Sequence, residues 1–172
     1  MKRTQKDLWV EAYNLLSSKK FNKAEKLLLK ALKAKDDIVI DRHFTYNTLI
    51  QLYYKLRNKR KDALEKCIVY CKEDIKRLPE FLETEEKTNR SQWDYSKERW
   101  GHLHNGEREG EYKYTPPQCP SVIQLAIIYE KNGEFQKAID ICNFALKLEL
   151  RDGTKGGFQG RKAKLEKKLN KD

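Results

Sequence analysis

The sequence has no long apolar run. A membrane-spanning helix needs about 18 or more consecutive apolar residues, and no window of the 172 residues approaches that length. The first residues, MKRTQKDLWVEAYNLL, are interrupted too often by polar side chains to form a secretory signal peptide. Four cysteines without such a leader are typical of a reducing compartment. We therefore predict a soluble cytoplasmic protein with reduced thiols and no membrane segment.

Candidate catalytic groups are also few. Cys67 and Cys71 lie four residues apart on an apolar helical face, and Cys142 falls at another apolar position. Cysteine at such positions behaves as a small buried hydrophobic residue. No pair of carboxylates stands out for acid–base chemistry. We therefore predict a protein that is not an enzyme and holds no cofactor or metal.

A zinc site is the metal alternative that the sequence offers. Cys119, which lies between prolines, is expected to face solvent and could join His102 and His104. Structural zinc sites usually have four ligands in paired spacing, and a fourth ligand is missing here. His43 stands alone near a predicted helix start, where a surface or capping role is expected.

The glycine-rich segment at residues 152–161 lacks the spacing of a nucleotide-binding loop. It follows a predicted helix rather than a strand, and the GxxxxGK[ST] pattern is absent. Its backbone N–H groups could cradle an anion ahead of the last helix. We favour a turn that seats a capping helix over the last hairpin, as terminal repeats require.

A helical hairpin at residues 121–150 is the clearest feature present. Leu125, Ala126 and Tyr129 recur at helical spacing before Asn132-Gly133. The stripe after this turn comprises Phe135, Ala138, Ile139, Cys142, Ala145 and Leu146. Gly133 can take a positive φ at little cost, so it can end the first helix and reverse the chain. The alanines leave room for a second helix to pack closely.

This hairpin resembles the tetratricopeptide repeat (TPR), whose pattern has a small residue, Tyr, Gly, an aromatic residue, Ala and Ala. The matching positions are Ala126, Tyr129, Gly133, Phe135, Ala138 and Ala145. Leu150 stands where the family usually has Pro. Residues 120–170 look like the end of a small bacterial or phage TPR-like protein. The resemblance implies stacked antiparallel hairpins in a right-handed superhelix, and it implies no activity.

Two earlier hairpins are expected at about residues 4–35 and 43–78. The spacing Thr4-x-x-Asp7 predicts a capping box at the start of the first. This hairpin matches the family pattern at Ala12, Phe21, Ala24 and Ala31. Lys19 stands where the family has Gly. The second hairpin matches the pattern less well.

Residues 79–120 interrupt the hairpin pattern. Pro79 is expected to stop the preceding helix, because proline cannot donate the next backbone hydrogen bond. A loop this long is usually functional or disordered. Within it we expect a short amphipathic helix over about Ser91 to Trp100. The spacing Ser121-x-x-Gln124 then predicts a capping box that restarts regular structure.

The favoured function is a non-catalytic scaffold that docks a peptide or protein partner. In the TPR family the first helix of each repeat lines a groove, and on that register Lys6, Trp9 and Tyr13 face it. Trp9 and Tyr13 lie four residues apart and form one aromatic patch of the kind that anchors interfaces, unless Trp9 packs against a neighbouring helix. Trp93 and Trp100 of the insert are further candidates for partner contact. The positions of the family's peptide-gripping carboxylate clamp are occupied here by Trp9, Tyr13, Leu49, Pro120 and Gln124.

The alternative function is nucleic-acid binding. The net charge is +11, with 37 Lys and Arg against 26 Asp and Glu. Basic residues crowd two predicted turns: Lys55, Arg57, Lys59, Arg60 and Lys61 in the first, and Arg151, Lys155, Arg161, Lys162 and Lys164 in the second. Phosphate contacts give salt-dependent affinity without sequence choice. No nucleic-acid motif is recognised, and Lys-rich helices are often simply well solvated, so this alternative ranks second.

We therefore predict one all-α domain over residues 1–172. Its parts are hairpins at about 4–35, 43–78 and 121–150, a long irregular insert at 79–120 and a C-terminal capping segment at 151–172.

Overall fold

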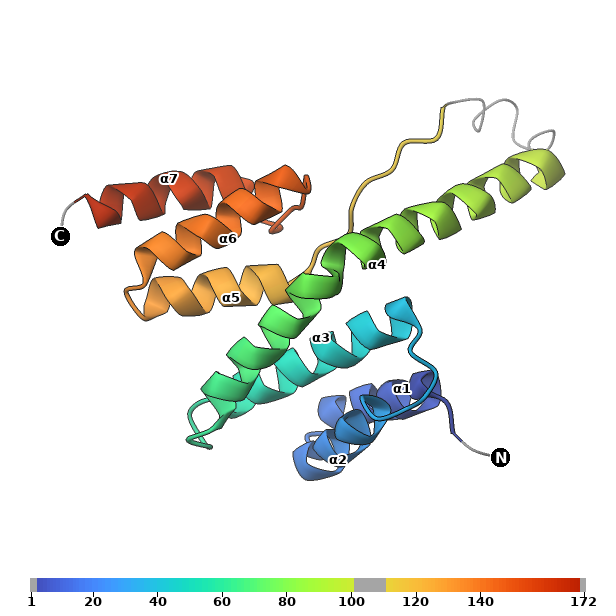
Figure 1. Ribbon diagram of the computed structural model, residues 1–172, viewed down its shortest axis with the longest axis horizontal. Helices are drawn as coiled ribbons and strands as arrows, with labels where there is room; N and C mark the ends of the chain where they lie inside the picture. The colour runs from blue at the N-terminus through green and yellow to red at the C-terminus, as the bar shows by residue number, and fades with distance from the viewer. Residues whose placement is uncertain (1–2, 101–110, 171–172) are drawn as a thin grey trace.

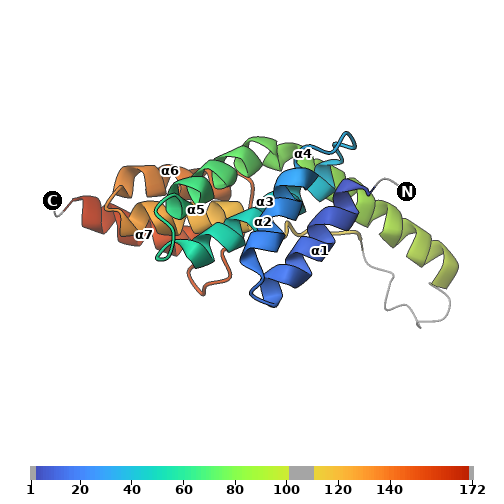
Figure 2. The ribbon, with the colours of Figure 1, turned by 90° about the horizontal axis from the view of Figure 1, so that it is seen from below.

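The computed structural model describes residues 3–100 and 111–170, and all regular structure within them is helical. The helices are α1 (Gln5–Ser17), α2 (Phe21–Ala31), α3 (Val39–Leu56), α4 (Ala63–Trp100), α5 (Pro120–Lys131), α6 (Phe135–Lys147) and α7 (Gly157–Leu169). Contacts join α1 to α2, α3 to α4, α5 to α6 and α6 to α7, so that sequence neighbours pack side by side (Figures 1 and 2). None of these helices is long and apolar enough to cross a membrane. The prediction of an all-α fold is confirmed.

A capping box begins α1, as the spacing of Thr4 and Asp7 predicts. The Thr4 backbone N–H donates to Asp7 Oδ2 at 2.9 Å, and the Asp7 N–H donates to Thr4 Oγ1 at 3.2 Å. Ala12 of α1 and Ala24 of α2 are fully buried. Small side chains at such positions allow two helix backbones to approach closely. The alanine pattern of the sequence therefore marks the inward faces of this hairpin.

Three chain reversals share one geometry. Gly133 has a φ of +75°, and the next N–H, that of Glu134, donates to Tyr129 O at 2.9 Å, which closes the end of α5. Lys19 after α1 (φ +58°) and Glu149 after α6 (φ +55°) hold the same position, and each is followed by the equivalent backbone hydrogen bond. A side chain crowds the left-handed conformation that glycine adopts freely. The turns at Lys19 and Glu149 therefore carry a conformational cost that the turn at Gly133 does not.

The helix α4 is a single helix of 38 residues with Pro79 inside it. The expectation that Pro79 ends a helix is therefore wrong. Proline removes one backbone donor and crowds the preceding turn, which bends a helix, and α4 changes direction along its length in Figure 1. Leu78 and Phe81 on either side of the proline are buried in the core, so packing carries the helix past it. The short helix expected over Ser91 to Trp100 is the end of this same helix.

The insert predicted at residues 79–120 is thus partly helical. Its segment 111–119 has no regular structure and returns toward the stack alongside α4 (Figure 1). The hydroxyls of Tyr112 and Tyr114 donate to backbone carbonyls of α4, each at 3.3 Å. The outer part of α4 and this returning segment project from the stacked helices, and we call them the arm (residues 83–100 and 111–116).

The start of α5 differs from the sequence prediction. Its N-cap residue is Cys119, and Pro120 occupies the first turn, where the N–H that proline lacks would have no helical partner. The capping box expected from Ser121 and Gln124 is not formed, because both residues lie inside the helix. Ser121 Oγ and Gln124 Nε2 are instead buried without a hydrogen-bond partner among the described residues.

The helix α7 packs on α6, as expected of a capping segment. Phe158 and Leu165 are buried in the common core. Asp152 holds the preceding turn, since its carboxylate accepts from the Thr154 N–H at 2.9 Å and from Arg161 Nε at 3.4 Å. The glycine-rich segment therefore serves to seat α7.

Candidate docking pocket

Trp9 on α1 contacts α3 and also lines a pocket. Its indole ring stacks on Phe44, with ring centroids 5.0 Å apart and planes at 22°. Its Nε1–H donates to Asp41 Oδ1 at 3.0 Å. Tyr13, one turn later, is 49% exposed and extends the same wall. Of the two alternatives that the sequence left open for Trp9, the structure shows packing against a neighbouring helix, and the residue also borders a hollow.

A buried polar network lies beside these rings and is centred on His43 of α3. Nδ1 of His43 lies 2.8 Å from Asp74 Oδ1 of α4, and Nε2 lies 2.9 Å from Asn47 Nδ2. A carboxylate accepts and an amide nitrogen donates, so in this arrangement Nδ1 donates to Asp74 and Nε2 accepts from Asn47. The ring also stacks on Phe81 at a centroid distance of 3.7 Å. The expectation of a surface or capping role for His43 is wrong, because α4 covers the ring and leaves the residue 5% exposed.

The segment that follows the arm closes the pocket from another side. Cys119, which was expected to face solvent, is 1% exposed, because its segment folds back against the helices. Its thiol donates to Pro117 O at 3.5 Å. Burial, and then the nearby carboxylates of Asp74 and Glu85, raise the pKa of the Cys119 thiol to about 12. This cysteine is therefore a packing residue.

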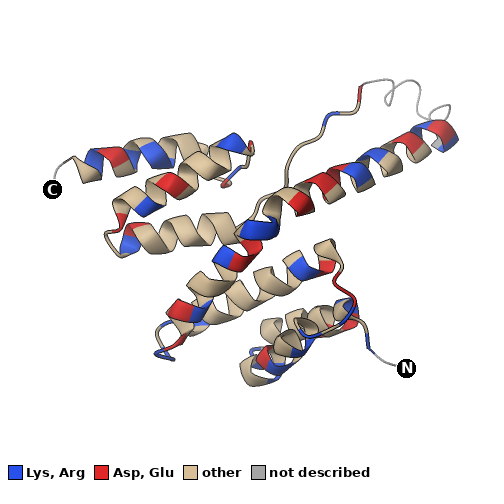
Figure 3. Ribbon diagram, viewed as in Figure 1, with Lys and Arg blue, Asp and Glu red and all other residues tan. Residues whose placement is uncertain are grey.

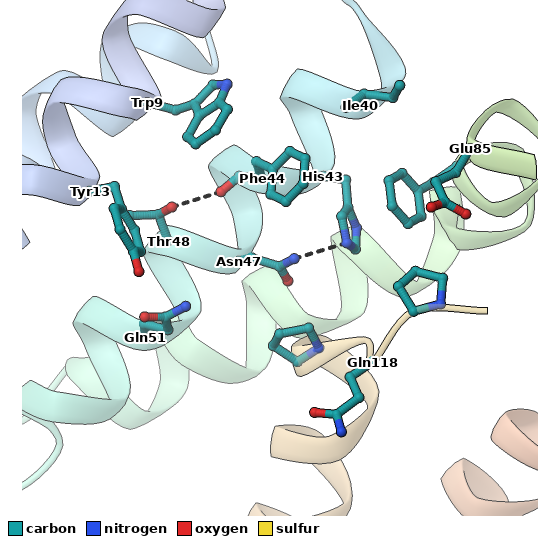
Figure 4. Close-up of a pocket in the computed structure, with 13 residues that line it drawn as sticks. Trp9, Tyr13, Ile40, His43, Phe44, Asn47, Thr48, Gln51, Glu85 and Gln118 are labelled. Carbon is teal, nitrogen blue, oxygen red and sulfur yellow. Dashed lines mark hydrogen bonds between the residues drawn. The ribbon is translucent and has the colours of Figure 1, made fainter. Parts of the chain in front are cut away.

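Together these elements enclose a pocket of about 390 Å³ (Figure 4). We call it the docking pocket; it is lined by Trp9, Tyr13, Ile40, His43, Phe44, Asn47, Thr48, Gln51, Phe81, Glu85, Pro117, Gln118 and Pro120. Rings and prolines supply most of its wall. In Figure 4 His43 lies between Asn47 and Glu85, with Trp9 and Tyr13 on the opposite helix. A volume of this size is at the lower end of the range of binding pockets.

Polar atoms of the docking pocket lack partners. Asn47 Oδ1 and Glu85 Oε2 are buried and accept no hydrogen bond from the described residues. Asp74 Oδ2, behind His43, is in the same situation. An unpaired buried acceptor costs about 1–3 kcal/mol, and native structures contain few of them. These three oxygen atoms are covered by protein atoms, so they form a polar cluster behind the pocket wall.

The remaining thiols are poor nucleophiles. Cys67, Cys71 and Cys142 are fully buried, as predicted from their apolar positions. A hydrogen bond with Cys67, followed by burial, raises the pKa of Cys71 far above its usual range. Burial raises the pKa of Cys142 to about 11. The thiolate is the reactive form of cysteine, and with raised pKa values Cys71 and Cys142 stay mostly protonated near neutral pH. Cys67 is shielded from reagents by its burial.

The described residues hold no group of three or more His, Cys, Asp or Glu side chains that could bind a metal ion. His102 and His104, considered above as zinc ligands, lie outside the described residues. Their expected companion Cys119 is buried against the helices.

The other residues predicted to contact a partner lie away from the docking pocket. Lys6 is exposed on α1, beside a shallow hollow that it shares with Val10. Trp93 lies on the arm, where its ring centroid is 6.3 Å from that of Tyr112. The helix α4 ends at Trp100, whose side chain lies outside the described residues.

The face of α3 in the pocket differs from the register that the family resemblance implied. Leu49, which that register placed toward the groove, is fully buried. Phe44, Thr48 and Gln51 line the pocket instead. Sequence reasoning missed all three, although a spacing of four and three residues marks one helical face.

The first basic turn, between α3 and α4, is partly neutralised. Arg60 Nη1 lies 2.7 Å from Glu25 Oε2, and Arg60 Nη2 lies 2.8 Å from Asp62 Oδ2. The Arg57 guanidinium lies 4.0 Å from the centroid of the Tyr54 ring. The exposed lysines of this turn are Lys55, Lys59 and Lys61. Fewer basic side chains of this turn are therefore available to contact phosphate groups than the sequence indicates.

The second basic segment is also partly paired, and it lies elsewhere. Arg161 Nη1 is 3.2 Å from Glu130 Oε2, and Arg161 Nε is 3.4 Å from Asp152 Oδ2. Lys155 is exposed in the same turn. Figures 1 and 3 place this turn and the α3–α4 turn well apart, so the two do not form one continuous basic surface.

No protein-family model matches the chain, and no curated protein or solved structure matches it either.

Proposed function

We propose that this protein is a non-catalytic, TPR-like scaffold that docks a peptide or protein segment in the docking pocket. The observation that carries the proposal is an open hollow walled by the rings of Trp9, Tyr13 and Phe44. Aromatic side chains in such positions dominate the binding energy of many interfaces. Tyr13 in particular is half-exposed, so a partner can cover it.

The order of the helices supports the same proposal. The helices α1, α3 and α5 are the first helices of three successive hairpins, and all three contribute lining residues. Stacked hairpins whose first helices share one face present a concave surface to a partner. We infer a right-handed superhelix of the TPR kind on this basis.

The chemistry of the pocket favours docking over catalysis. Both ring nitrogens of His43 are engaged in hydrogen bonds, so neither is free to take a proton from a substrate. The nearby thiol of Cys119 has a raised pKa. We place the scaffold in the cytoplasm, where a reducing environment would preserve its four free thiols.

Selection from a library of short random peptides tests the proposal. We expect purified protein to enrich a defined peptide family. Tyr13→Ala should weaken the affinity for it roughly tenfold or more, since loss of an interface anchor removes about 1.4 kcal/mol or more. Tyr95→Ala is the matched control, because Tyr95 is an equally exposed tyrosine on the arm. Equal affinities of the two variants would contradict the proposal.

Nucleic-acid binding is the second candidate, and the exposed Lys55, Lys59 and Lys61 favour it. A labelled single-stranded oligonucleotide should then bind with strong salt dependence. Replacing Lys59 and Lys61 by Ala should lower both the affinity and the salt slope. An unchanged slope would remove this candidate, whereas peptide binding should not respond to these substitutions.

A further inference from the structure

The docking pocket differs in charge from the chain around it. The sequence has 37 Lys and Arg against 26 Asp and Glu, but no lysine or arginine lies among the 13 residues that line the pocket. Glu85 is the one Asp, Glu, Lys or Arg residue among them. A cavity that has no Lys or Arg in its lining, although these residues are in excess in the chain, and that has a carboxylate is suited to binding a cation.

Two more carboxylates stand directly behind the lining. Asp41 accepts from the Trp9 indole at 3.0 Å, and Asp74 accepts from His43 at 2.8 Å. Both are buried, at 6% and 1% exposure, where charges are screened less than at the surface. Their negative potential therefore extends into the docking pocket and adds to that of Glu85.

The unpaired acceptors specify what the occupant must supply. Asn47 is 6% exposed, and its Oδ1 has no donor among the described residues. Glu85 Oε1 accepts from Asn89 Nδ2 at 2.6 Å. Its Oε2 has no donor in hydrogen-bond geometry among the described residues, although the nearby Tyr114 hydroxyl has its pKa raised by burial and by the Glu85 carboxylate. Asn47 and Glu85 lie on either side of His43 in Figure 4. Protein atoms cover both unpaired oxygens, so an occupant reaches them only when these side chains turn toward the pocket, and N–H donors would then satisfy them where an apolar group would not.

The aromatic wall suits the same occupant. Trp9 and Phe44 form a stacked pair at the edge of the pocket, and a cation is attracted to the face of such rings. The aliphatic stem of a lysine or arginine side chain can also pack on them while its charged end reaches deeper. An acidic side chain would meet the like charge of Glu85, and the donors in the lining are neutral ones such as the Tyr13 hydroxyl and the amides of Gln51 and Gln118.

We propose that the docking pocket binds a lysine or arginine side chain of the partner peptide. Its ammonium or guanidinium group pairs with the Glu85 carboxylate, and its stem packs against Trp9 and Phe44. The inference rests on the proposed docking function and adds the chemistry of the anchor residue. No bond is made or broken in this interaction.

Peptide selection with a positional library tests the inference directly. We expect wild-type protein to select Lys or Arg at one fixed position. A synthetic peptide with that residue should bind at least roughly tenfold more tightly than the same peptide with norleucine, which keeps an unbranched stem but lacks the charge. Added salt should narrow this difference.

Glu85→Gln keeps the size of the side chain and removes its charge. We expect it to abolish most of the preference for the cationic peptide over the norleucine peptide. Glu83→Gln is the matched control, because Glu83 lies on the same helix, is 67% exposed and pairs with Lys87. Glu85→Lys should select acidic anchors instead, and circular dichroism of each variant checks that the helices remain.

Several outcomes separate the two proposals. The protein could select peptides with an apolar or acidic anchor residue, and their binding could still be weakened by Tyr13→Ala. That result would contradict the proposal of a cationic anchor but would agree with the proposed docking function. Sedimentation could show that the protein self-associates and that Glu85→Gln abolishes the self-association. A second copy of the chain would then fill the pocket, which would contradict the proposal that a partner peptide is the occupant. Enrichment of no peptide at all would contradict both proposals.

Discussion

His43 Nδ1 lies 2.8 Å from Asp74 Oδ1, and this contact joins α3 to α4 at the wall of the docking pocket. Both side chains are almost fully buried. With the Nδ1 proton donated to Asp74, Nε2 accepts from Asn47, and the Asn47 carbonyl oxygen has no donor among the described residues. One buried pair thus sets the hydrogen-bond pattern at the pocket wall.

The first prediction concerns the strength of this pair. Asp74→Ala should lower the free energy of unfolding by about 2 kcal/mol or more, because a hydrogen bond to a charged group is lost and His43 Nδ1 is left unpaired. Urea unfolding followed by circular dichroism measures the change.

The adjacent Glu73→Ala is the control for that prediction. Glu73 forms an exposed ion pair with Lys76 on the same helix, and exposed pairs contribute about 0–1 kcal/mol. Equal losses for the two variants would show that the buried pair does not stabilise the contact between α3 and α4.

The second prediction concerns the thiols. In native buffer at neutral pH, a thiol reagent should label all four cysteines slowly, since each is buried and the pKa of Cys119 and Cys142 is raised. Labelling should become fast once urea unfolds the chain. Ser17→Cys on the exposed end of α1 should react at once in native buffer. Fast native labelling of Cys119 would contradict its place in the pocket wall.

The features that the sequence predicted correctly depend on neighbours along the chain. The Thr4 and Asp7 capping box spans three residues, and Gly133 sets a local turn. Ala12 and Ala24 are inward positions that helical periodicity alone marks. Such patterns determine helix starts, reversals and the buried stripe, so the all-α architecture follows from them.

The features that the sequence did not predict depend on contacts between distant residues. His43 is buried by Asp74, which lies 31 residues later. Cys119 is covered because its segment folds back beside α4, where Tyr114 bonds to the backbone 32 residues earlier. Pro79 remains helical because its neighbours pack into the core. Periodicity therefore cannot predict the parts of the docking pocket supplied by His43, Phe81 and the segment before α5, whereas the Trp9 and Tyr13 wall and the face of α3 with Phe44, Thr48 and Gln51 follow helical spacing.

The third prediction concerns pH and the attachment of α7. Burial alone would raise the pKa of Asp152, but hydrogen bonds from Thr154 and the charge of Arg161 outweigh it and hold the pKa below 3.8. The Lys168 hydrogen bond is the largest influence on Glu130 and holds its pKa below 4.5. The folded state therefore binds these protons more weakly than the unfolded state. Their stabilisation is complete above the ordinary pKa values and is lost as pH falls through the lower folded ones.

Asp152→Asn tests this linkage. At neutral pH the variant should lose about 1–2 kcal/mol of unfolding free energy. The difference from wild type should shrink as pH falls below 3.8, because the wild-type carboxyl then becomes protonated. Urea unfolding at a series of pH values measures it. Asp140→Asn, which alters an exposed carboxylate bonded to Gln136, should change stability little. A difference for Asp152→Asn that is constant down to the lowest pH would contradict the linkage.

The last prediction concerns Lys19, which ends α1 with a φ of +58°. A side chain is strained in this region, and glycine is not. Lys19→Gly should therefore raise the free energy of unfolding by about 0.5–1 kcal/mol, after allowance for the greater freedom of glycine in the unfolded chain. Lys20→Gly is the neighbouring control, since Lys20 has a φ of −85° and glycine relieves no left-handed strain there.

The opposite substitution at the equivalent turn completes the test of that geometry. Gly133→Ala should lower the free energy of unfolding by about 1 kcal/mol. No atom lies within 4 Å of the position that its Cβ would occupy, so the loss can come only from the backbone conformation. Opposite signs at Lys19 and Gly133 would establish that the two hairpins turn in the same way. A gain for Lys20→Gly as large as that for Lys19→Gly would instead attribute the effect to lost lysine charge.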